Sequence, residues 1–356
     1  MVSLLVMEGD GIGPEICGAT LNVLRAADRR FELKLGFTTA TIGFAALKAQ
    51  GTTCPDSAIA TAKAADGVIL GPVSHNEYPP VAEGGLNPSG EMRKRLDLYA
   101  NIRPARTRGG FPARCGTPID LVIVRENTEG FYADRSMHLG PGEFMPTPDL
   151  ALAVRKITRQ GCTRIAETAF ALALRRRKKV TAVHKANVLR VSEGLFLESV
   201  RAVAARFPEA AYEERLVDAM TALLVRDASP FDVIVTTNMF GDILSDLASE
   251  IAGSLGLAAS LNASATHAVA QAQHGSAPDI ADKDLANPAS LIGSAAMLIA
   301  WLGERRQDER LTRAADAIEA ALERAISAPQ WRTRDLGGPL GTAAFGERVA
   351  ALVGEV

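Results

Sequence analysis

Short apolar runs alternate along most of the chain with longer segments in which apolar residues recur every three or four positions. The short runs predict buried β-strands, and the longer segments predict amphipathic helices. This alternation is typical of an α/β fold. The predicted strands are Ser3–Met7, Leu33–Thr38, Gly67–Leu70, Ala100–Arg103, Ile119–Arg125, Val180–His184 and Asp232–Thr236. The predicted helices include Pro14–Ala27, Ala151–Arg176, Val191–Phe207, Val217–Arg226, Met239–Ala252, Ala289–Gly303 and Leu311–Ile326.

Three segments lack both periods. Pro104–Pro118 and Ser136–Pro148 are rich in residues that favour turns, and we expect loops there, the second with an extended arm. Between Gly256 and Pro288 the helical period fades and Gly, Ser, Asn and Pro accumulate. A structureless loop of that length is unusual in a compact domain unless it is functional, so we interpret it as a binding segment.

Composition narrows the class of protein. A chain of 356 residues exceeds the size at which one core stops growing, so two lobes are expected. The net charge of -2 argues against nucleic-acid binding, and the basic run Arg175–Lys179 is interpreted as a solvated helix end. Cys17, Cys54, Cys115 and Cys162 have no CxxC spacing, which indicates reduced thiols in a cytoplasm. No signal peptide or membrane-spanning stretch is recognised, and a soluble protein without a membrane partner is expected.

The first candidate motif is Gly9-Asp10-Gly11-Ile12-Gly13, between a predicted strand and a predicted helix. Its spacing is GxGxG followed by Pro14, not the GxGxxG of a Rossmann fold, and no acidic residue ends the second strand. A tight turn and a ligand-binding loop explain it equally well.

Three arginines lie close to predicted strand ends: Arg93, Arg103 and Arg125. The carboxyl ends of buried parallel strands are where α/β proteins place ligand groups. Guanidinium groups pair bidentately with carboxylates, so three converging arginines would suit a di- or tricarboxylate. Each one alone is more typical of a surface ion pair.

Asp242 and Asp246 are four residues apart on a predicted helix, and both carboxylates therefore project from one face. Such a pair is destabilising by roughly 0.2–0.5 kcal/mol unless a cation lies between the two charges. Mg²⁺ or Mn²⁺, which take oxygen ligands, is the natural candidate. Placement at a helix N-terminus is the alternative for Asp242, but it does not account for Asp246.

Two further segments carry candidate chemistry. Lys185 follows the strand Val180–His184, where partial desolvation would make it a general base, although a solvated lysine is the simpler alternative. His274–Asp279, followed by Asn287, forms a turn with free backbone donors and a carboxylate that can bind a ribose diol. An ordinary proline turn explains the second segment equally well.

The order and wording of these motifs resemble one family. GDGIGPE, RKRLDLYANIRP, RENTEGFY, HKAN, NMFGDILSD and HGSAPDIADKDLANP resemble the β-decarboxylating dehydrogenases, which act on isopropylmalate, isocitrate, homoisocitrate and tartrate or D-malate. The resemblance runs from about Leu5 to Asn287. It implies a two-lobed α/β fold like that of isopropylmalate dehydrogenase and unlike the Rossmann fold. Residues 1–98 and 253–356 would form a larger, cofactor-binding lobe, and residues 99–252 a smaller lobe with the dimer interface.

The resemblance also assigns roles, residue by residue. Arg93, Arg103 and Arg125 look like the carboxylate clamp, with Ser89 and Asn187 as further substrate contacts. Tyr132 resembles the acid that protonates the enolate, and Lys185 resembles the base, donated across a homodimer. Asp242 and Asp246, with Asp218 of the partner subunit, resemble the ligands of Mg²⁺ or Mn²⁺. The cofactor-binding residues it implies are His274, Gly275, Ser276, Ala277, Asp279, Ile280 and Asn287.

The implied activity is NAD- and metal-dependent oxidative decarboxylation of a (2R)-malate-type 2-hydroxy acid. In this family a carboxylate at the Asp279 position goes with NAD, because it would repel a 2′-phosphate. The segment before Arg93 departs from the isopropylmalate pattern, with Leu86 where those enzymes have glutamate. Gly90 stands where homoisocitrate enzymes have arginine, and Asn87 and Ser89 where isocitrate enzymes have serine and asparagine.

The substrate therefore stays open among substituted malates. Small polar residues before the first arginine would also suit tartrate or D-malate. A non-catalytic regulatory subunit of the same fold is a further alternative, as is a metal-dependent lyase or hydrolase without nicotinamide. The segment Ala270–Gln273 replaces the usual Phe-Glu-Pro-Val of the family, so the cofactor loop is expected to differ in shape.

Overall fold

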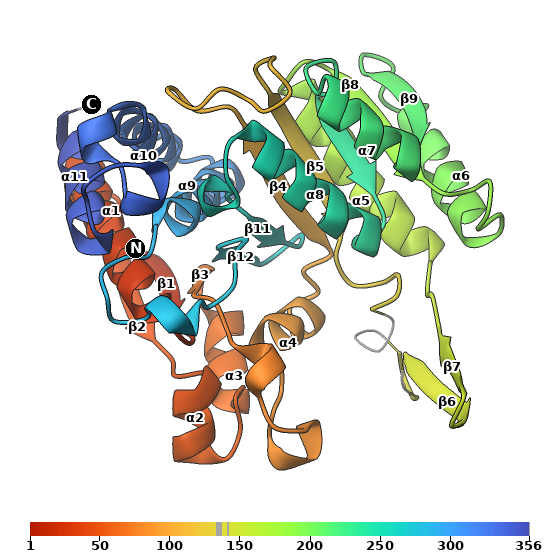
Figure 1. Ribbon diagram of the computed structural model, residues 1–356, viewed down its shortest axis with the longest axis horizontal. Coiled ribbons are helices and arrows are strands. Elements are labelled where there is room, and N and C mark those ends of the chain that lie inside the picture. The colour runs from red at the N-terminus through yellow and green to blue at the C-terminus, as the bar shows by residue number, and fades with distance from the viewer. Residues whose placement is uncertain (133–136, 141, 356) are drawn as a thin grey trace. The chain divides into compact units, whose positions relative to one another are not determined.

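The computed structural model describes residues 1–132, 137–140 and 142–355, and the chain divides into two compact units. Unit 1 comprises Met1–Leu96, Arg108–Phe111 and Ser254–Val356, and unit 2 comprises Asp97–Thr107 and Pro112–Gly253. In Figure 1 the colours of unit 2 run from orange through yellow and green to teal, and unit 1 takes the two ends of the scale. The segment Arg108–Phe111, expected in the smaller lobe, belongs to unit 1 because the buried Arg108 guanidinium pairs with Glu319 and Glu323.

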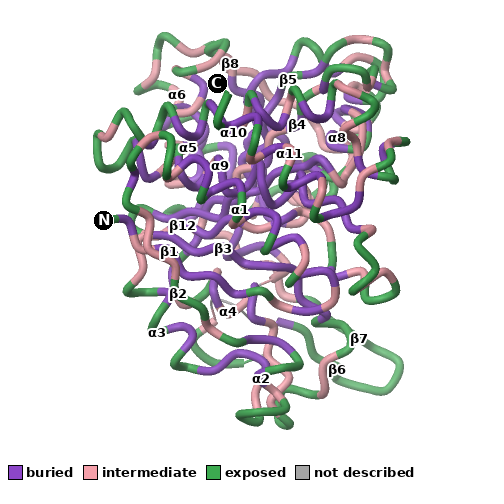
Figure 2. Tube along the Cα trace, turned by 90° about the vertical axis from the view of Figure 1, so that its left-hand side faces the viewer, coloured by how far each residue is buried: buried purple, intermediate pink, exposed green. Residues whose placement is uncertain are grey.

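Unit 1 contributes five sheet strands in the order β2-β1-β3-β12-β11, of which the first four are parallel and β11 is antiparallel to β12. The strands are β1 (Val2–Met7), β2 (Leu35–Thr39), β3 (Gly67–Leu70), β11 (Leu261–Ala263) and β12 (Ala268–Gln271). β1, β3 and β12 are almost wholly buried (Figure 2), as their mainly apolar sequences require.

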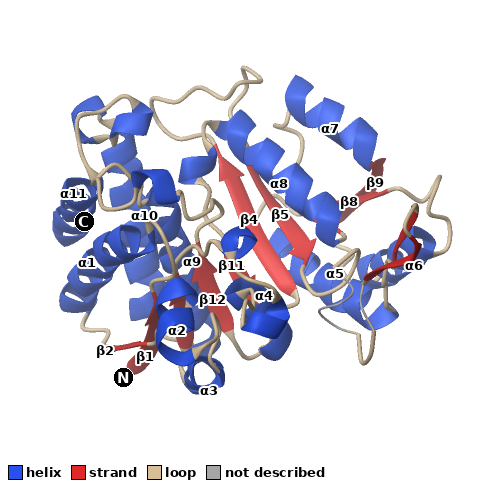
Figure 3. Cartoon of the chain, turned by 60° about the horizontal axis from the view of Figure 1, so that its bottom comes forward, coloured by secondary structure: helices blue, strands red, loops and turns tan. Residues whose placement is uncertain are grey.

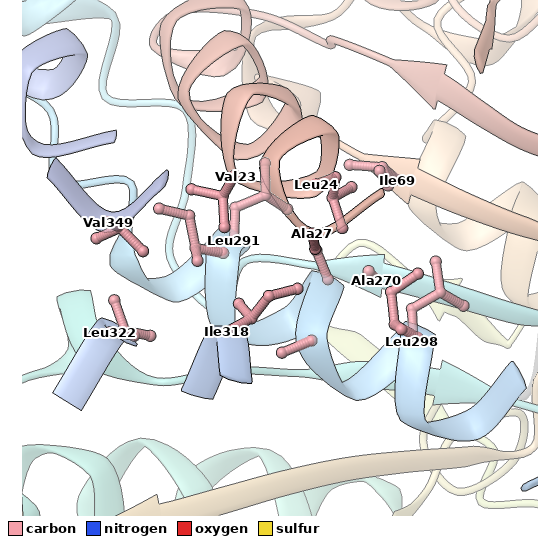
Figure 4. Packing of buried hydrophobic residues seen from close by; sticks show 14 of the residues in the cluster. Val23, Leu24, Ala27, Ile69, Ala270, Leu291, Leu298, Ile318, Leu322 and Val349 are labelled. Atoms are coloured by element: carbon pink, nitrogen blue, oxygen red, sulfur yellow. The ribbon is translucent and has the colours of Figure 1, made fainter. Parts of the chain in front are cut away.

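The helices of unit 1 are α1 (Gly13–Phe31), α2 (Gly43–Gln50), α3 (Asp56–Ala64), α4 (Pro88–Arg95), α9 (Ala289–Arg306), α10 (Glu309–Ser327) and α11 (Thr342–Glu355). Short 3₁₀ helices lie at His75–Glu77, Val81–Glu83, Leu255–Leu257, Pro278–Ile280, Pro329–Trp331 and Arg334–Leu336. Helix α1 packs against α9, α10 and α11, so the two ends of the chain share one core. In Figure 4, Val23 and Ala27 of α1 lie near Leu291 and Ile318.

Unit 2 contributes a second set of five sheet strands in the order β4-β5-β10-β8-β9, in which β4 is antiparallel to β5 and the other pairs are parallel. Its strands are β4 (Ala100–Arg106), β5 (Asp120–Glu126), β8 (Lys179–His184), β9 (Ala211–Leu216) and β10 (Val233–Thr236). Its helices are α5 (Arg159–Leu174), α6 (Ser192–Ala204), α7 (Val217–Arg226) and α8 (Asn238–Ala252).

Both faces of this second set of strands are covered by helices. Val122 and Val124 of β5 belong to the core under α5 and α6, whereas Leu121 and Ile123 belong to the core under α7 and α8. Because successive strand residues point to opposite faces, a strand buried on both sides must be apolar at every position. Figure 3 shows α8 running alongside β4 and β5.

A separate two-stranded sheet in unit 2 pairs β6 (Glu143–Thr147) with β7 (Leu150–Ala153) in antiparallel fashion. Every residue of this β6–β7 hairpin is exposed, including the large apolar side chains Phe144, Met145, Leu150 and Leu152 (Figure 2). Exposed apolar clusters of this kind mark interaction surfaces.

The α/β fold expected from the sequence is confirmed, but several element bounds were wrong. The helix expected over Ala151–Arg176 begins only at Arg159, because the Thr158 side chain caps it by accepting from the Gly161 N–H, and residues 150–153 form β7. β4 continues through Pro104 to Arg106, which were assigned to a loop. Residues Gly256–Pro288 contain β11 and β12, so they are not structureless.

Two simpler expectations concern the whole chain. All four cysteines are free thiols in the structure, as their scattered positions predicted. Among the described residues, no helix is both long enough and apolar enough to span a bilayer.

Candidate functional site

Two buried arginines point from the sheet of unit 2 toward helix α8. Arg103 on β4 and Arg125 on β5 occupy the same alternating positions as Ala105 and Ile123, whose side chains face α7 and α8. On this face of the sheet, apolar side chains occupy the positions nearer the start of β5. The two guanidinium groups occupy the positions nearest the start of α8. Two of the three predicted arginines, Arg103 and Arg125, are thus brought together by the pleat of adjacent strands, whereas Arg93 lies on α4 of unit 1.

Arg103 lies between the two helical aspartates. Its Nη1 donates to Asp242 Oδ1 at 3.1 Å, to Ser245 Oγ at 2.8 Å and to Asp246 Oδ1 at 3.3 Å. The i, i+4 pair was expected to need a cation, and in this structure Arg103 supplies it. Burial, reinforced by the neighbouring Arg125 charge, lowers the pKa of the Arg103 guanidinium to about 10.

Arg125 is more deeply buried than Arg103, with 1% of its surface exposed. Its Nε and Nη2 donate to Asn238 Oδ1 at 2.9 and 2.6 Å, and its Nη1 donates to Asp242 Oδ1. Gly241 permits this approach, because a Cβ built there would lie 2.6 Å from Arg125 Cγ. Asn238, Gly241 and Ser245 were not singled out from the sequence, although all three lie within the NMFGDILSD motif.

Tyr132 completes this cluster. Its hydroxyl donates to Asp242 Oδ2 at 3.3 Å, and the Arg125 guanidinium carbon lies 5.8 Å from the centre of its ring. Four predicted site residues, Arg103, Arg125, Tyr132 and Asp242, therefore meet at the start of α8.

Lys185 lies in a different cluster of unit 2. It follows β8, and its Nζ is 2.5 Å from Asp218 Oδ1 at the start of α7. This hydrogen bond lowers the pKa of Asp218 below its usual value. Asn187, in the turn after Lys185, is exposed.

The aspartates can be tested as metal ligands. Asp242 and Asp246 present carboxylate oxygens on one face of α8, with side chains 36% and 54% exposed. Within the described residues, no group of three or more Asp, Glu, His or Cys side chains is arranged to hold a metal. Asp242 and Asp246 could supply two oxygen ligands to a divalent metal. A third protein ligand would have to come from outside this cluster.

In unit 1, the loop Gly9–Gly13 is organised by Asp10, which is 8% exposed. Asp10 Oδ1 accepts from the Phe44 N–H at 2.8 Å, and Oδ2 accepts from the Ser74 N–H at 3.0 Å and from the Tyr78 hydroxyl. Burial and the Asp10 carboxylate raise the pKa of Tyr78, which keeps this hydroxyl protonated. Asp10 and Tyr78 were not predicted as site residues.

This loop is joined to the HGSAPD turn. Ser74 Oγ lies 2.7 Å from Ser276 Oγ, and the Ile12 N–H donates to the Ser276 carbonyl at 2.9 Å. Gly11 has φ +56°, and a Cβ built there would lie 2.1 Å from the Ser276 carbonyl oxygen. The glycine motif therefore allows close contact between two loops, and both readings of it, tight turn and part of a ligand site, remain compatible with that contact.

The remaining predicted cofactor residues surround this turn. Within the part of the chain that the structure describes, His274 Nε2 is buried and has no hydrogen-bond partner, and burial lowers the pKa of the imidazole. Asn287 donates to Asp335 Oδ2 at 3.0 Å. The other members lie in or beside the 3₁₀ helix Pro278–Ile280: Gly275 and Asp279 are exposed, Ala277 has φ +37°, and Ala277 and Ile280 pack on the core of unit 1. A buried, unpaired ring nitrogen beside an exposed carboxylate fits a polar cofactor.

Ser89 and Arg93 lie one turn apart on α4 of unit 1. Ser89 Oγ donates to Gln271 Oε1 at 3.0 Å, and Asn262 Nδ2 donates to the same oxygen at 3.4 Å. Gln271 was noticed in the sequence only as a departure in the cofactor loop. The Gln271 side-chain amide, with the groups that donate to it, makes this part of unit 1 polar.

Comparisons with known proteins match the chain over almost its whole length. The family model for isocitrate/isopropylmalate dehydrogenase matches residues 3–349. A 3-isopropylmalate/3-methylmalate dehydrogenase of Methanocaldococcus jannaschii is 40% identical over 361 residues, covering 100% of both chains. An isocitrate/homoisocitrate dehydrogenase of Thermus thermophilus is 41% identical over 348 residues, covering 97% of each chain.

The fold is matched as well. The crystal structure of an isocitrate dehydrogenase from Methylococcus capsulatus aligns with a TM-score of 0.88 and 38% identity, covering 99% of this chain and 100% of that one. These relatives differ in the acids that their names give, so the comparisons define the class of reaction and leave the substrate open.

Proposed function

The chain belongs to the isocitrate/isopropylmalate dehydrogenase family and is an oxidoreductase of hydroxy acids, and on that premise we propose that it oxidises and decarboxylates a (2R)-malate-type acid with NAD and a divalent metal. One observation supports this most directly. Arg103 and Arg125 are buried beside Asp242, so two cationic carboxylate binders and a metal-binding carboxylate share one location.

The charges of this cluster balance before any ligand is present. Two guanidinium groups face the carboxylates of Asp242 and Asp246. A divalent cation on the aspartates would free Arg103 and Arg125 to pair with the two carboxylates of a malate-type substrate, and the total charge would again be neutral. Arg93 is proposed as the third member of the clamp.

The chain's own residues supply the proton transfers. Lys185 of the partner subunit takes the proton of the substrate hydroxyl, and Tyr132 delivers a proton to carbon after CO₂ has left. When bound, a divalent metal held by Asp242 and Asp246 would supply Lewis-acid polarisation of the substrate's oxygen, and a nicotinamide would supply the hydride acceptor. Tyr132 already donates to Asp242, so its hydroxyl lies beside the proposed metal ligands.

NAD is proposed as the cofactor because Asp279, within the His274–Ile280 turn, is exposed. Its carboxylate can accept from a ribose diol and would repel a 2′-phosphate. His274 Nε2, buried and unpaired, offers a further contact.

A homodimer with shared active sites is proposed for two reasons. Asp218 pairs with Lys185 and lies outside the Asp242 cluster of its own chain, so a second chain is needed to complete a three-aspartate site. Large apolar side chains are exposed on unit 2, namely Phe144, Met145, Leu150 and Leu152 of the β6–β7 hairpin, and Val188, Val191, Val225 and Ile243.

The substrate is proposed to carry a small or polar group, not an isopropyl group. Ser89, Gln271 and Asn262 form a polar hydrogen-bonded set one turn from Arg93. A polar surface of this kind pays a desolvation cost against an apolar substituent, which favours isocitrate, homoisocitrate, tartrate or D-malate. A non-catalytic subunit is the second candidate, but the chain retains Tyr132, Lys185 and all three aspartates.

The test is NADH formation with Mn²⁺ and a panel of D-malate, tartrate, isopropylmalate, isocitrate and homoisocitrate. We expect NADH with at least one polar acid, and weaker activity with isopropylmalate. The same panel with NADP tests the cofactor preference. Absence of NADH with every acid would refute the proposed activity.

A further inference from the structure

Unit 2 contains a buried ion pair that the proposed chemistry does not use. Glu193 in the first turn of α6 is fully buried, and the Arg155 side chain, which precedes α5, is 9% exposed. Arg155 Nη2 donates to Glu193 Oε1. Burying two charges costs desolvation energy that their attraction often fails to recover, so such a pair is weak evidence of a contribution to stability. Its contacts with other segments indicate a different role.

The first of these contacts leads to Lys185. Glu193 uses its second oxygen, Oε2, to accept from the Lys185 backbone N–H at 2.9 Å. One carboxylate therefore holds the Arg155 guanidinium on one side and the main chain of the proposed base on the other. The position from which the Lys185 side chain extends is fixed by this bond.

The second contact leads to helix α8. Arg155 Nη2 donates to Thr237 Oγ1 at 3.0 Å, and Thr237 is the residue before α8 begins. The Arg155 guanidinium carbon also lies 5.6 Å from the centre of the Phe240 ring, in the first turn of that helix. Asp242, whose carboxylate is a proposed metal ligand, follows Phe240 by two residues in the same helix.

The third contact leads to the segment that carries Tyr132. The Arg155 guanidinium carbon lies 5.7 Å from the centre of the Phe131 ring, which is adjacent to Tyr132 in the chain. Lys156, next to Arg155, exchanges two backbone hydrogen bonds with Gly130, at 2.8 and 3.0 Å. The Tyr132 segment is thus joined at Gly130 to the backbone of Lys156 and at the Phe131 ring to the Arg155 side chain.

We propose that Arg155 is a positioning residue, which through Glu193, Thr237 and Phe131 fixes the three segments that carry the proposed base, metal ligands and acid. The roles of those three segments rest on the proposed function. Arginine suits the task because its planar guanidinium donates to several acceptors in one plane while its faces contact aromatic rings. Lysine keeps the charge but cannot make these contacts together.

The test compares Arg155→Lys with Arg176→Lys, a matched change at another ion pair of unit 2. Arg176 Nε is 2.8 Å from Asp232 Oδ1, Asp232 is 1% exposed, and this pair lies at the opposite end of β10 from Thr237. Hydrogen exchange is measured on peptides covering residues 184–190 and 237–243. We expect exchange in both peptides to rise by about tenfold in Arg155→Lys and to stay unchanged in Arg176→Lys.

Two milder variants separate the branches. Glu193→Gln should raise exchange at the Lys185 amide and leave the start of α8 protected. Thr237→Val should raise exchange at the start of α8 alone and should weaken Mn²⁺ binding measured by calorimetry. The proposal would be overturned if hydrogen exchange in Arg155→Lys rose uniformly across unit 2, or if it did not rise at all.

Kinetics then separate this proposal from the proposed function. For Arg155→Lys we expect kcat to fall by about a hundredfold, because misplacement of about 1 Å is sufficient for that loss. The KM for NAD should stay constant, because the candidate cofactor residues lie in unit 1. An active wild type whose Arg155→Lys variant keeps its kcat refutes the positioning role alone. An inactive wild type with the expected exchange pattern refutes the dehydrogenase proposal alone.

Discussion

The two units have similar sheets but build their polar sites by different means. In each unit, parallel strands lie beside one antiparallel strand. In unit 1 the candidate cofactor loops are joined by backbone groups, hydroxyls and one buried carboxylate, Asp10. In unit 2 the site consists of full charges in contact, with Arg103 and Arg125 against Asp242.

This difference follows from what each site is proposed to bind. A dinucleotide is recognised largely by loop shape, which requires backbones in close contact and glycine where a Cβ would collide. A small polyacid and a metal ion are recognised by charge, which requires buried charges that are paired until the ligands arrive. Unit 1 should therefore be sensitive to added volume, and unit 2 to removed charge.

The largest effect is expected for Asp242→Asn in unit 2. The buried guanidinium groups of Arg103 and Arg125 would lose the carboxylate they share, which should lower the free energy of unfolding by about 3 kcal/mol. Mn²⁺ binding and NADH formation should be lost as well. Urea unfolding and Mn²⁺ calorimetry measure these changes.

Asp246→Asn is the matched control for that substitution. Asp246 is 54% exposed, and its contact with Arg103, at 3.3 Å, is longer than the Arg103–Asp242 contact at 3.1 Å. Its loss should reduce stability by less than about 1 kcal/mol while still weakening the metal. Equal destabilisation by the two variants would contradict the view that Asp242, which both arginines share, contributes more to neutralising them than Asp246 does.

The next effect is expected for Gly11→Ala in unit 1. The new Cβ would collide with the Ser276 carbonyl at 2.1 Å, and alanine is strained at φ +56°, so we expect a loss of about 2 kcal/mol. The KM for NAD should rise by about tenfold with little change in the KM for the acid. In the control Gly18→Ala on α1 nothing lies within 4 Å of the added Cβ, and stability should increase slightly. An unchanged KM for NAD in Gly11→Ala would show that the two loops do not act together.

A smaller effect is expected for Tyr78→Phe. The Asp10 carboxylate would lose one hydrogen bond and keep those from the Phe44 and Ser74 N–H groups, at a cost of about 1–2 kcal/mol. The KM for NAD should rise a few-fold and kcat should stay constant. Steady-state kinetics with each substrate varied in turn measure this, and a change confined to the acid would argue against it.

The smallest effect concerns pH, with one histidine in each unit. Burial lowers the pKa of His274 in unit 1 and of His184 in unit 2, where Nδ1 accepts from the Ala186 N–H. Folding therefore favours the neutral rings, so their contribution to stability is full above the unfolded pKa of about 6.5 and is lost as the pH falls below it. Unfolding free energies from about pH 7.5 to 5.5 should show a slope that His274→Asn and His184→Asn each reduce. A slope unaffected by both variants would assign it to other groups.

Local patterns made most of the fold predictable from the sequence. The helix Val217–Arg226 has the predicted bounds, and β3 matches its predicted range, because each has a clear period or an uninterrupted apolar run. β9 was missed because its sequence, AYEERL, has three consecutive charged residues at a sheet edge, where Glu213 pairs with Lys179. β7, with the sequence LALA, fits a helix or a strand equally well.

The site was predictable only as far as its residues lie in local motifs. The spacing of Asp242 and Asp246 predicted a cation between them, and the structure places Arg103 there, which comes from another strand. The Arg155–Glu193 pair spans 38 residues, and its two members share no motif. Contacts of this kind depend on tertiary structure, which no local period encodes.

The composition of unit 1 from both ends of the chain has a consequence for how the protein matures on the ribosome. Unit 2 is complete in sequence once residue 253 has been synthesised, whereas α1 must wait for α11, more than three hundred residues later. Domains commonly fold from the N-terminus onward during synthesis. Here unit 2 can fold before unit 1 is complete. Until α11 has been synthesised, the apolar face of α1 stays uncovered, and a chaperone is most useful at that stage.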